Sequence, residues 1–105
     1  MSGEWIDLGD DHAIQWVSWA PNRDLNPQYT DLPDVERYAA DVRHLNPQGQ
    51  PCMGYITIES EVARRIGTGS PTWDVLSWDP LTLSPSLLCS CGDHGWIRGG
   101  RWVRA

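Results

Sequence analysis

The chain has 105 residues, a formal net charge of −6, eight arginines without any lysine, and seven tryptophans without any phenylalanine. This length predicts one domain spanning residues 1–105, with a small core to which large indole rings contribute much of the buried area. An acidic chain lacks the surplus of cations on which binding to a phosphate backbone depends, so the composition disfavours a nucleic-acid-binding protein.

The N-terminal third predicts two short strands followed by a loop. Residues 4–8 and 12–20 are separated by Gly-Asp-Asp, and the second segment alternates large apolar residues between its two faces. A period of two with tryptophan, isoleucine and valine is typical of a β-strand. Residues 21–34 contain three prolines together with several Asn and Asp, so we expect a long proline-rich loop there.

The middle of the chain predicts a β-hairpin. Residues 35–44 contain good helix formers, but the alternation of Tyr, Ala, Val and His at every second position favours a strand. A turn is expected at 46–49, where the sequence reads Asn-Pro-Gln-Gly, and a second strand at 52–58. If the hairpin pivots near the centre of this turn, His44 and Cys52 lie opposite each other on one face.

The C-terminal half predicts a short helix and further strands. We expect helical turns at 60–66, a strand at 73–78 and a turn-rich connection at 80–85. Residues 96–103 contain a central Gly-Gly pair, which suits a tight hairpin because both turn residues need a positive φ. The predicted fold class is therefore mainly β, a small α+β protein of antiparallel hairpins with one short helix and a zinc-ribbon-like metal site.

The metal site is predicted from a cluster of cysteine and histidine. Cys89, Cys91 and His94 fall within six residues, and thiolate and imidazole are ligands that Zn²⁺ prefers. Cys91 and His94 form one pair at a common ligand spacing, and His44 with Cys52 supplies a second pair. We predict one structural zinc ion held by His44, Cys52, Cys91 and His94, with Cys89 as the first alternative ligand. Taken singly, each residue could instead be structural: a buried cysteine, a strand-end histidine or a turn cap.

The three cysteines also indicate a compartment. They cannot all pair in disulfides, and the N-terminus shows no apolar leader of the kind that directs export. We therefore expect reduced thiols and a cytoplasmic protein. No segment approaches the roughly 20 apolar residues that span a bilayer, so no membrane partner is expected.

The C-terminal quarter resembles a family of small uncharacterised proteins, a domain of unknown function, from actinobacteria and their phages. The motifs that carry this resemblance are Leu-Ser-Pro-Ser at 83–86, Cys-x₂-His at 91–94, and aromatic-Ile-Arg-x-Gly at 96–100. The family has a cysteine-rich knuckle upstream, which in this chain is reduced to His44 and Cys52. The resemblance implies a zinc-binding β fold and a phage or phage-derived protein, and some relatives accompany bacterial ubiquitin-like conjugation genes.

Catalysis is not expected. The chain has no Gly-x-Ser-x-Gly elbow, phosphate loop or His-Glu-x₂-His motif. A zinc hydrolase, with Asp93 as the general base, and a component of a ubiquitin-like conjugation system are further alternatives.

The predicted activity is binding to a protein partner of the host or the phage. The acidic N-terminal third and the surplus of tryptophan suit a protein interface. The alternative is a nucleic-acid-binding zinc module that uses the tryptophans and arginines of the C-terminal hairpin.

Overall fold

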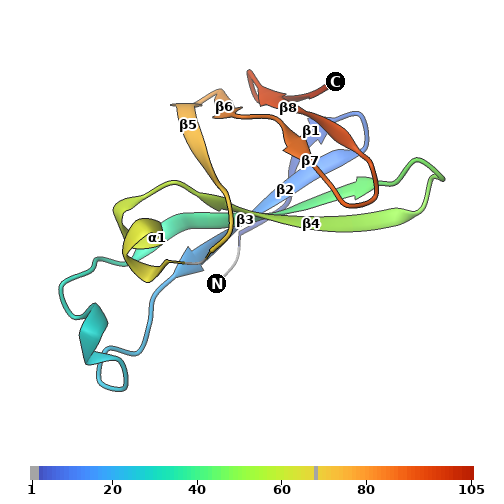
Figure 1. Cartoon of the computed structure of the whole chain (residues 1–105). Coiled ribbons are helices and arrows are strands. Elements are labelled where there is room, and N and C mark those ends of the chain that lie inside the picture. The colour runs from blue at the N-terminus through green and yellow to red at the C-terminus, as the bar shows by residue number, and fades with distance from the viewer. Residues whose placement is uncertain (1–2, 68) are drawn as a thin grey trace.

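The computed structural model describes residues 3–67 and 69–105, which form two β-sheets (Figure 1). The larger sheet has six strands in chain order, namely β1 (Ile6–Gly9), β2 (His12–Trp19), β3 (Val35–Leu45), β4 (Pro51–Ile58), β5 (Thr72–Trp78) and β6 (Leu81–Ser84). The smaller sheet has three, namely β7 (Leu87–Leu88), β8 (His94–Arg98) and β9 (Arg101–Arg104). All neighbouring strands are antiparallel except β4 and β5, which pair in parallel over two residues.

The predicted fold class is confirmed, since the described chain is mainly β with one short α-helix and antiparallel hairpins. The helix α1 (Glu61–Ile66) begins where expected because the Ser60 side chain accepts a hydrogen bond from Ala63 N at 3.0 Å. It ends at Gly67, whose φ of 67° is the left-handed conformation that favours glycine. No helix in the described part of the chain is long and apolar enough to cross a membrane.

The predicted middle hairpin is confirmed together with its register, because His44 of β3 lies directly opposite Cys52 of β4. The alternation in β2 also holds. Ile14 and Trp16 pack toward the main core, while Val17 and Trp19 pack into a second cluster on the other face. The predicted loop over residues 21–34 lies between β2 and β3 and contains a single 3₁₀ turn at Pro27–Tyr29.

The prediction for residues 80–85 is wrong. Residues 80–85, expected to form a turn-rich connection, contain the strand β6, which pairs with β5. Pro80 and Pro85 stand outside the two ends of this strand, where the missing N–H groups cost no ladder hydrogen bond. The proline density therefore marked the boundaries of a strand.

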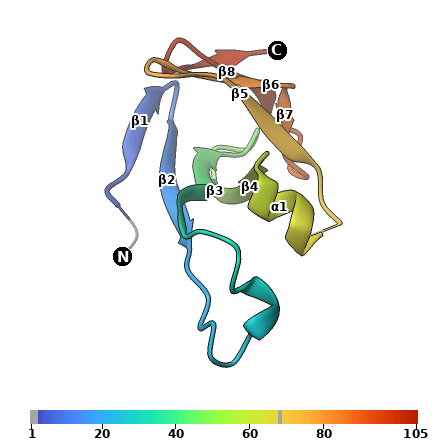
Figure 2. The same cartoon turned by 90° about the vertical axis from the view of Figure 1, so that its left-hand side faces the viewer.

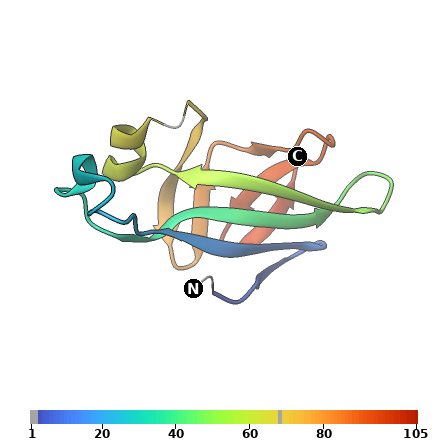
Figure 3. The same ribbon diagram turned by 90° about the horizontal axis from the view of Figure 1, so that it is seen from below.

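The two sheets enclose the main core. Figure 2 shows β5, β6 and β8 on one side of the strands β2 to β4, and α1 beside β4. Buried side chains from both sheets meet between them: Leu8, Ile14, Ala40, Val42, Ile56, Ile58, Leu81, Leu83, Leu87, Ile97 and Trp102. In Figure 3 the β3–β4 turn lies at one end of the long strands, and α1 with the loop after β2 lies at the other. A second cluster packs at that α1 end: Leu32, Tyr38, Ala39, Val62 and Ala63.

Candidate metal centre

The β3–β4 hairpin supplies the first two side chains of the site. The turn after β3 is closed by Asn46, whose side-chain oxygen accepts from Gln48 N at 3.0 Å and from Gln50 N at 2.9 Å. This turn fixes the register that places His44 beside Cys52 on the face toward the smaller sheet. His44 is buried, with 3% of its surface exposed, and Cys52 is half-buried.

The loop between β7 and β8 supplies the other two. Cys89 N donates to Asp93 O at 2.8 Å, and Gly92 N donates to Cys89 O at 2.9 Å. Gly92 has a φ of 100°, which a residue with a side chain rarely adopts. This tight loop turns Cys89 and Cys91 toward the β3–β4 hairpin.

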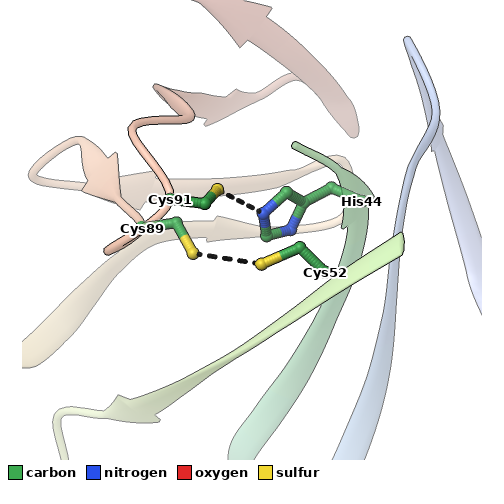
Figure 4. A group of neighbouring side chains, drawn as sticks. All are labelled: His44, Cys52, Cys89 and Cys91. Carbon is green, nitrogen blue, oxygen red and sulfur yellow. Dashed lines mark hydrogen bonds between the residues drawn. The ribbon is translucent and has the colours of Figure 1, made fainter. Parts of the chain in front are cut away.

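Four side chains converge in this way from two sheets (Figure 4). The donor atoms of His44, Cys52, Cys89 and Cys91 all lie within 4.8 Å of one another. His44 Nε2 is 3.4 Å from Cys91 Sγ, and Cys52 Sγ is 3.7 Å from Cys89 Sγ. The latter distance far exceeds a disulfide bond of about 2.05 Å, and all three cysteines are free. One histidine and three cysteines could therefore hold a metal ion.

Three of the four predicted ligands belong to this group, and Cys89, the predicted alternative, takes the fourth place. The structure does not bring His94 to it. His94 is the first residue of β8, is exposed, and lies with Nε2 at 2.9 Å from Ser86 Oγ. Its neighbour Gly95 is the buried one, because successive residues of a strand face opposite sides. In the sequence, the Cys-x-Cys spacing followed by glycine was the local signal for the pair Cys89 and Cys91.

The thiols of the group perturb one another. Burial raises the pKa of Cys89, but hydrogen bonds from Cys91, Cys52 and His44 outweigh it and lower that pKa from 9.0 to about 7. The hydrogen bond to Cys89, followed by burial, raises the pKa of Cys52 to about 11. The two thiols therefore differ in the direction of their pKa shifts, with Cys89 the more readily deprotonated of the two.

A second group of buried side chains lies beside His44, and the sequence pattern gave no sign of its member His12. His12 Nε2 lies 2.6 Å from Asp93 Oδ2, and its Nδ1 lies 2.6 Å from the Asp10 carbonyl oxygen. The His12 ring is stacked between Trp102, at 4.0 Å between centroids, and His44, at 5.4 Å. His12, His44 and Asp93 together form a second set whose donor atoms lie within 4.8 Å. The stacked His12 ring therefore constrains the orientation of the His44 ring.

Gly95 makes room for that stack. A Cβ atom at this position would lie 2.6 Å from a ring atom of Trp102 and 2.5 Å from the Val103 carbonyl oxygen. Only glycine therefore lets the indole lie flat against His12. The Trp102 Nε1 and His44 Nδ1 atoms are buried and have no hydrogen-bond partner within residues 3–67 and 69–105. Both residues line one cavity of about 70 Å³ beside the site.

Comparison with protein-family models, with curated proteins and with solved structures finds no match in any of the three. The resemblance of the C-terminal motifs to a phage and actinobacterial family therefore stays a prediction. What stands is a small β-rich protein with a Cys/His group that could hold a metal ion.

Proposed function

We propose that this chain is a non-enzymatic protein-binding module whose two sheets are joined by one structural zinc ion at His44, Cys52, Cys89 and Cys91. The observation that carries the zinc part of the proposal is the spacing of the four donor atoms. A tetrahedral Zn²⁺ with Zn–S bonds of about 2.3 Å and a Zn–N bond of about 2.0–2.1 Å separates two sulfurs by ~3.8 Å and a sulfur from a nitrogen by ~3.5 Å. The distances of 3.7 Å and 3.4 Å match these edges.

The donor set supports zinc over other cations. Three cysteines and one histidine are soft and borderline ligands, which suit Zn²⁺ in a tetrahedral structural site and disfavour Mg²⁺ or Ca²⁺. Two donors come from β3 and β4 of the larger sheet, and two from the loop of the smaller sheet. A cation at their centre would cross-link segments 37 to 47 residues apart, so its binding energy becomes folding energy.

The same geometry argues against a catalytic metal. A catalytic zinc keeps three protein ligands and an open position, whereas this group offers four. Asp93, the candidate base of a hydrolase, is 8% exposed and is already in contact with His12. A positioning role toward the buried histidines fits Asp93 better than proton transfer to a substrate.

Binding to a protein partner is favoured by the surface. Large apolar side chains are exposed on strands of both sheets: Met53, Tyr55, Leu76 and Leu88, each with more than half of its surface accessible. The net charge of −6 would attract a basic partner and repel nucleic acid. We expect a pull-down from host lysate to recover one stoichiometric protein.

Metal content tests the zinc proposal. Mass spectrometry of the native protein should find one zinc per chain in the wild type and none in Cys89→Ser or Cys91→Ser. His94→Ala is the matched control, because His94 lies in the neighbouring strand but outside the group, and this variant should keep its zinc. Full zinc content in both serine variants, or loss in His94→Ala alone, would contradict the ligand assignment.

A second candidate function, binding of single-stranded nucleic acid, is favoured by one contact in the C-terminal hairpin. The Arg98 guanidinium lies 4.5 Å from the centroid of the Trp96 ring, an arrangement that can stack on a base. Retention on single-stranded DNA that falls with salt and is lost in Trp96→Ala would favour this candidate over the protein-binding module.

A further inference from the structure

Two tryptophan rings form an aromatic cage around an arginine side chain, at a part of the larger sheet away from the Cys/His group. Trp16 of β2 and Trp78 of β5 have ring centroids 5.8 Å apart and an angle of 58° between their planes. The Arg37 guanidinium of β3 lies across both rings, with Cζ 5.5 Å from the Trp16 centroid and 5.2 Å from that of Trp78. A cation within about 6 Å of an aromatic centroid is attracted by the electrons of the ring face. The two indoles therefore already hold a guanidinium.

Within residues 3–67 and 69–105, Arg37 is held by these two rings alone. Among the residues that the structure describes, its guanidinium has no hydrogen bond or ion pair, in contrast to Arg23, Arg65 and Arg104, which each pair with an aspartate. Glu36 and Asp79, beside the cage, likewise have no ion pair within the described ranges. The cage thus has two ring faces and, in the linings of the cavities beside it, two carboxylates without an ion pair in the described part of the chain.

The cage opens into a cavity large enough for a side chain. A cavity of about 330 Å³ is lined by Trp16, Arg37, Trp78 and Asp79 over an apolar floor from β1, β2 and β6. A second cavity of about 330 Å³ lies against Trp16 and Arg37 and is lined also by Glu36. Trp78 is 46% exposed, so one face of the cage is accessible from solvent.

We propose that Trp16, Trp78 and Asp79 form a receptor for an arginine side chain of the protein partner, and that Arg37 is a tethered competitor occupying it in the free protein. This inference rests on the proposed function as a protein-binding module and names the chemistry of its partner. The guanidinium of Arg37 shows which group the rings accept. The free carboxylates and the net charge of −6 complement a basic surface, which steers such a partner toward the cage.

The arrangement also explains how the competitor can be displaced. The incoming arginine gains the same contacts with the two rings and adds an ion pair with Asp79, which Arg37 does not make in the described structure. Arg37 itself is exposed, and its guanidinium can move into water without leaving a buried charge. Occupation by Arg37 lowers the affinity for the partner without abolishing it.

The test is an NMR titration of the ¹⁵N-labelled, zinc-loaded protein with acetyl-Gly-Arg-Gly-amide, following the seven tryptophan indole N–H signals. The peptide should shift the signals of Trp16 and Trp78. Arg37→Ala should bind it about fivefold more tightly, because the tethered guanidinium no longer competes for the two ring faces. Trp78→Leu, which keeps an apolar group at a half-exposed site, should lose the response, and Asp79→Asn should weaken it.

Trp96→Leu is the matched control, since Trp96 also stacks on an arginine but lies in the smaller sheet; this variant should bind as the wild type does. Equal affinity in wild type and Arg37→Ala, or unchanged binding in Trp78→Leu, overturns the proposal. A larger response to a single-stranded oligonucleotide than to the peptide overturns it in favour of base stacking. A pull-down distinguishes failure of this proposal from failure of the proposed function. A protein partner captured equally by the wild type and by Trp78→Leu refutes the arginine receptor but not the protein-binding module. Capture of no protein partner by the wild type refutes the protein-binding module itself.

Discussion

The two ends of the long β3 and β4 strands are held by different forces. At the end with the β3–β4 turn, polar side chains meet between the sheets, with the Trp102 ring stacked on one of them: the four metal-binding candidates and the buried pair His12 and Asp93. At the other end, α1 and the loop after β2 are held by an apolar cluster around Tyr38 and Val62. The stability of an apolar cluster does not require a ligand. The stability of a cluster of thiols and an imidazole changes when a metal ion binds to it. If the proposed zinc ion is bound, metal supply should therefore act on the end with the β3–β4 turn, where the described Cys/His group lies.

Metal removal should give the largest effect and should act on one end only. Chelation, or Cys91→Ser, is expected to cost several kcal/mol and to lower the melting temperature by more than about 10 °C, because the proposed zinc ion would cross-link the two sheets. Hydrogen exchange should accelerate first in the β7–β8 loop and the β3–β4 turn, while α1 stays protected. Uniform exchange across both ends would contradict the division into two regions.

Gly95→Ala should give the next largest effect. The added Cβ meets both a Trp102 ring atom and the Val103 carbonyl oxygen at less than 3 Å, so the stack on His12 must shift. We expect a loss of about 2–3 kcal/mol and weaker retention of the metal, measured by urea unfolding and by competition with a chelator.

Gly54→Ala is the control for this change. Gly54 is also a strand glycine with negative φ, but its Cβ would approach nothing closer than 3.9 Å. The stability of Gly54→Ala should equal that of the wild type or be slightly higher. If Gly54→Ala and Gly95→Ala lost the same amount of stability, the clash of the new Cβ with Trp102 and Val103 would be ruled out as the cause.

Val62→Ala should weaken the other end without touching the metal. Val62 is 2% exposed in the second apolar cluster, so removing two methyl groups should cost about 1–2 kcal/mol. Metal content by mass spectrometry should stay at the wild-type value. A variant that lost metal as well would show that the two ends unfold as one unit.

The ion pair between Arg65 and Asp31 should give the smallest effect. The Arg65 guanidinium, 3.2 Å from the Asp31 carboxylate, lowers the pKa of Asp31 below 3.8. A lowered pKa in the folded state stabilises the protein above the unfolded pKa, and this contribution is lost as the pH falls through the folded value. Asp31→Asn should therefore reduce stability slightly at pH 7 and flatten its decline below pH 4, measured by urea unfolding; both groups are exposed, so the change is small.

Much of the local structure followed from the sequence. The alternation in residues 35–44 and the Asn-Pro-Gln-Gly turn predicted the hairpin and the facing pair His44 and Cys52, which the structure confirms. The helix after Ser60 was likewise predicted and is confirmed by its caps. These features depend on neighbours within about ten residues, whose propensities and turn geometry can be read directly.

The composition of the candidate site was decided by the tertiary structure. Cys89 and His94 were both available at short spacing from Cys91, and the pairing of β8 with β7 turned His94 away while the loop turned Cys89 inward. His12 is 81 residues from Asp93, and no local pattern links the two. The types of metal-binding residue are a property of the sequence, but which of them meet depends on how two sheets pack, because that packing is set by the whole apolar core between them.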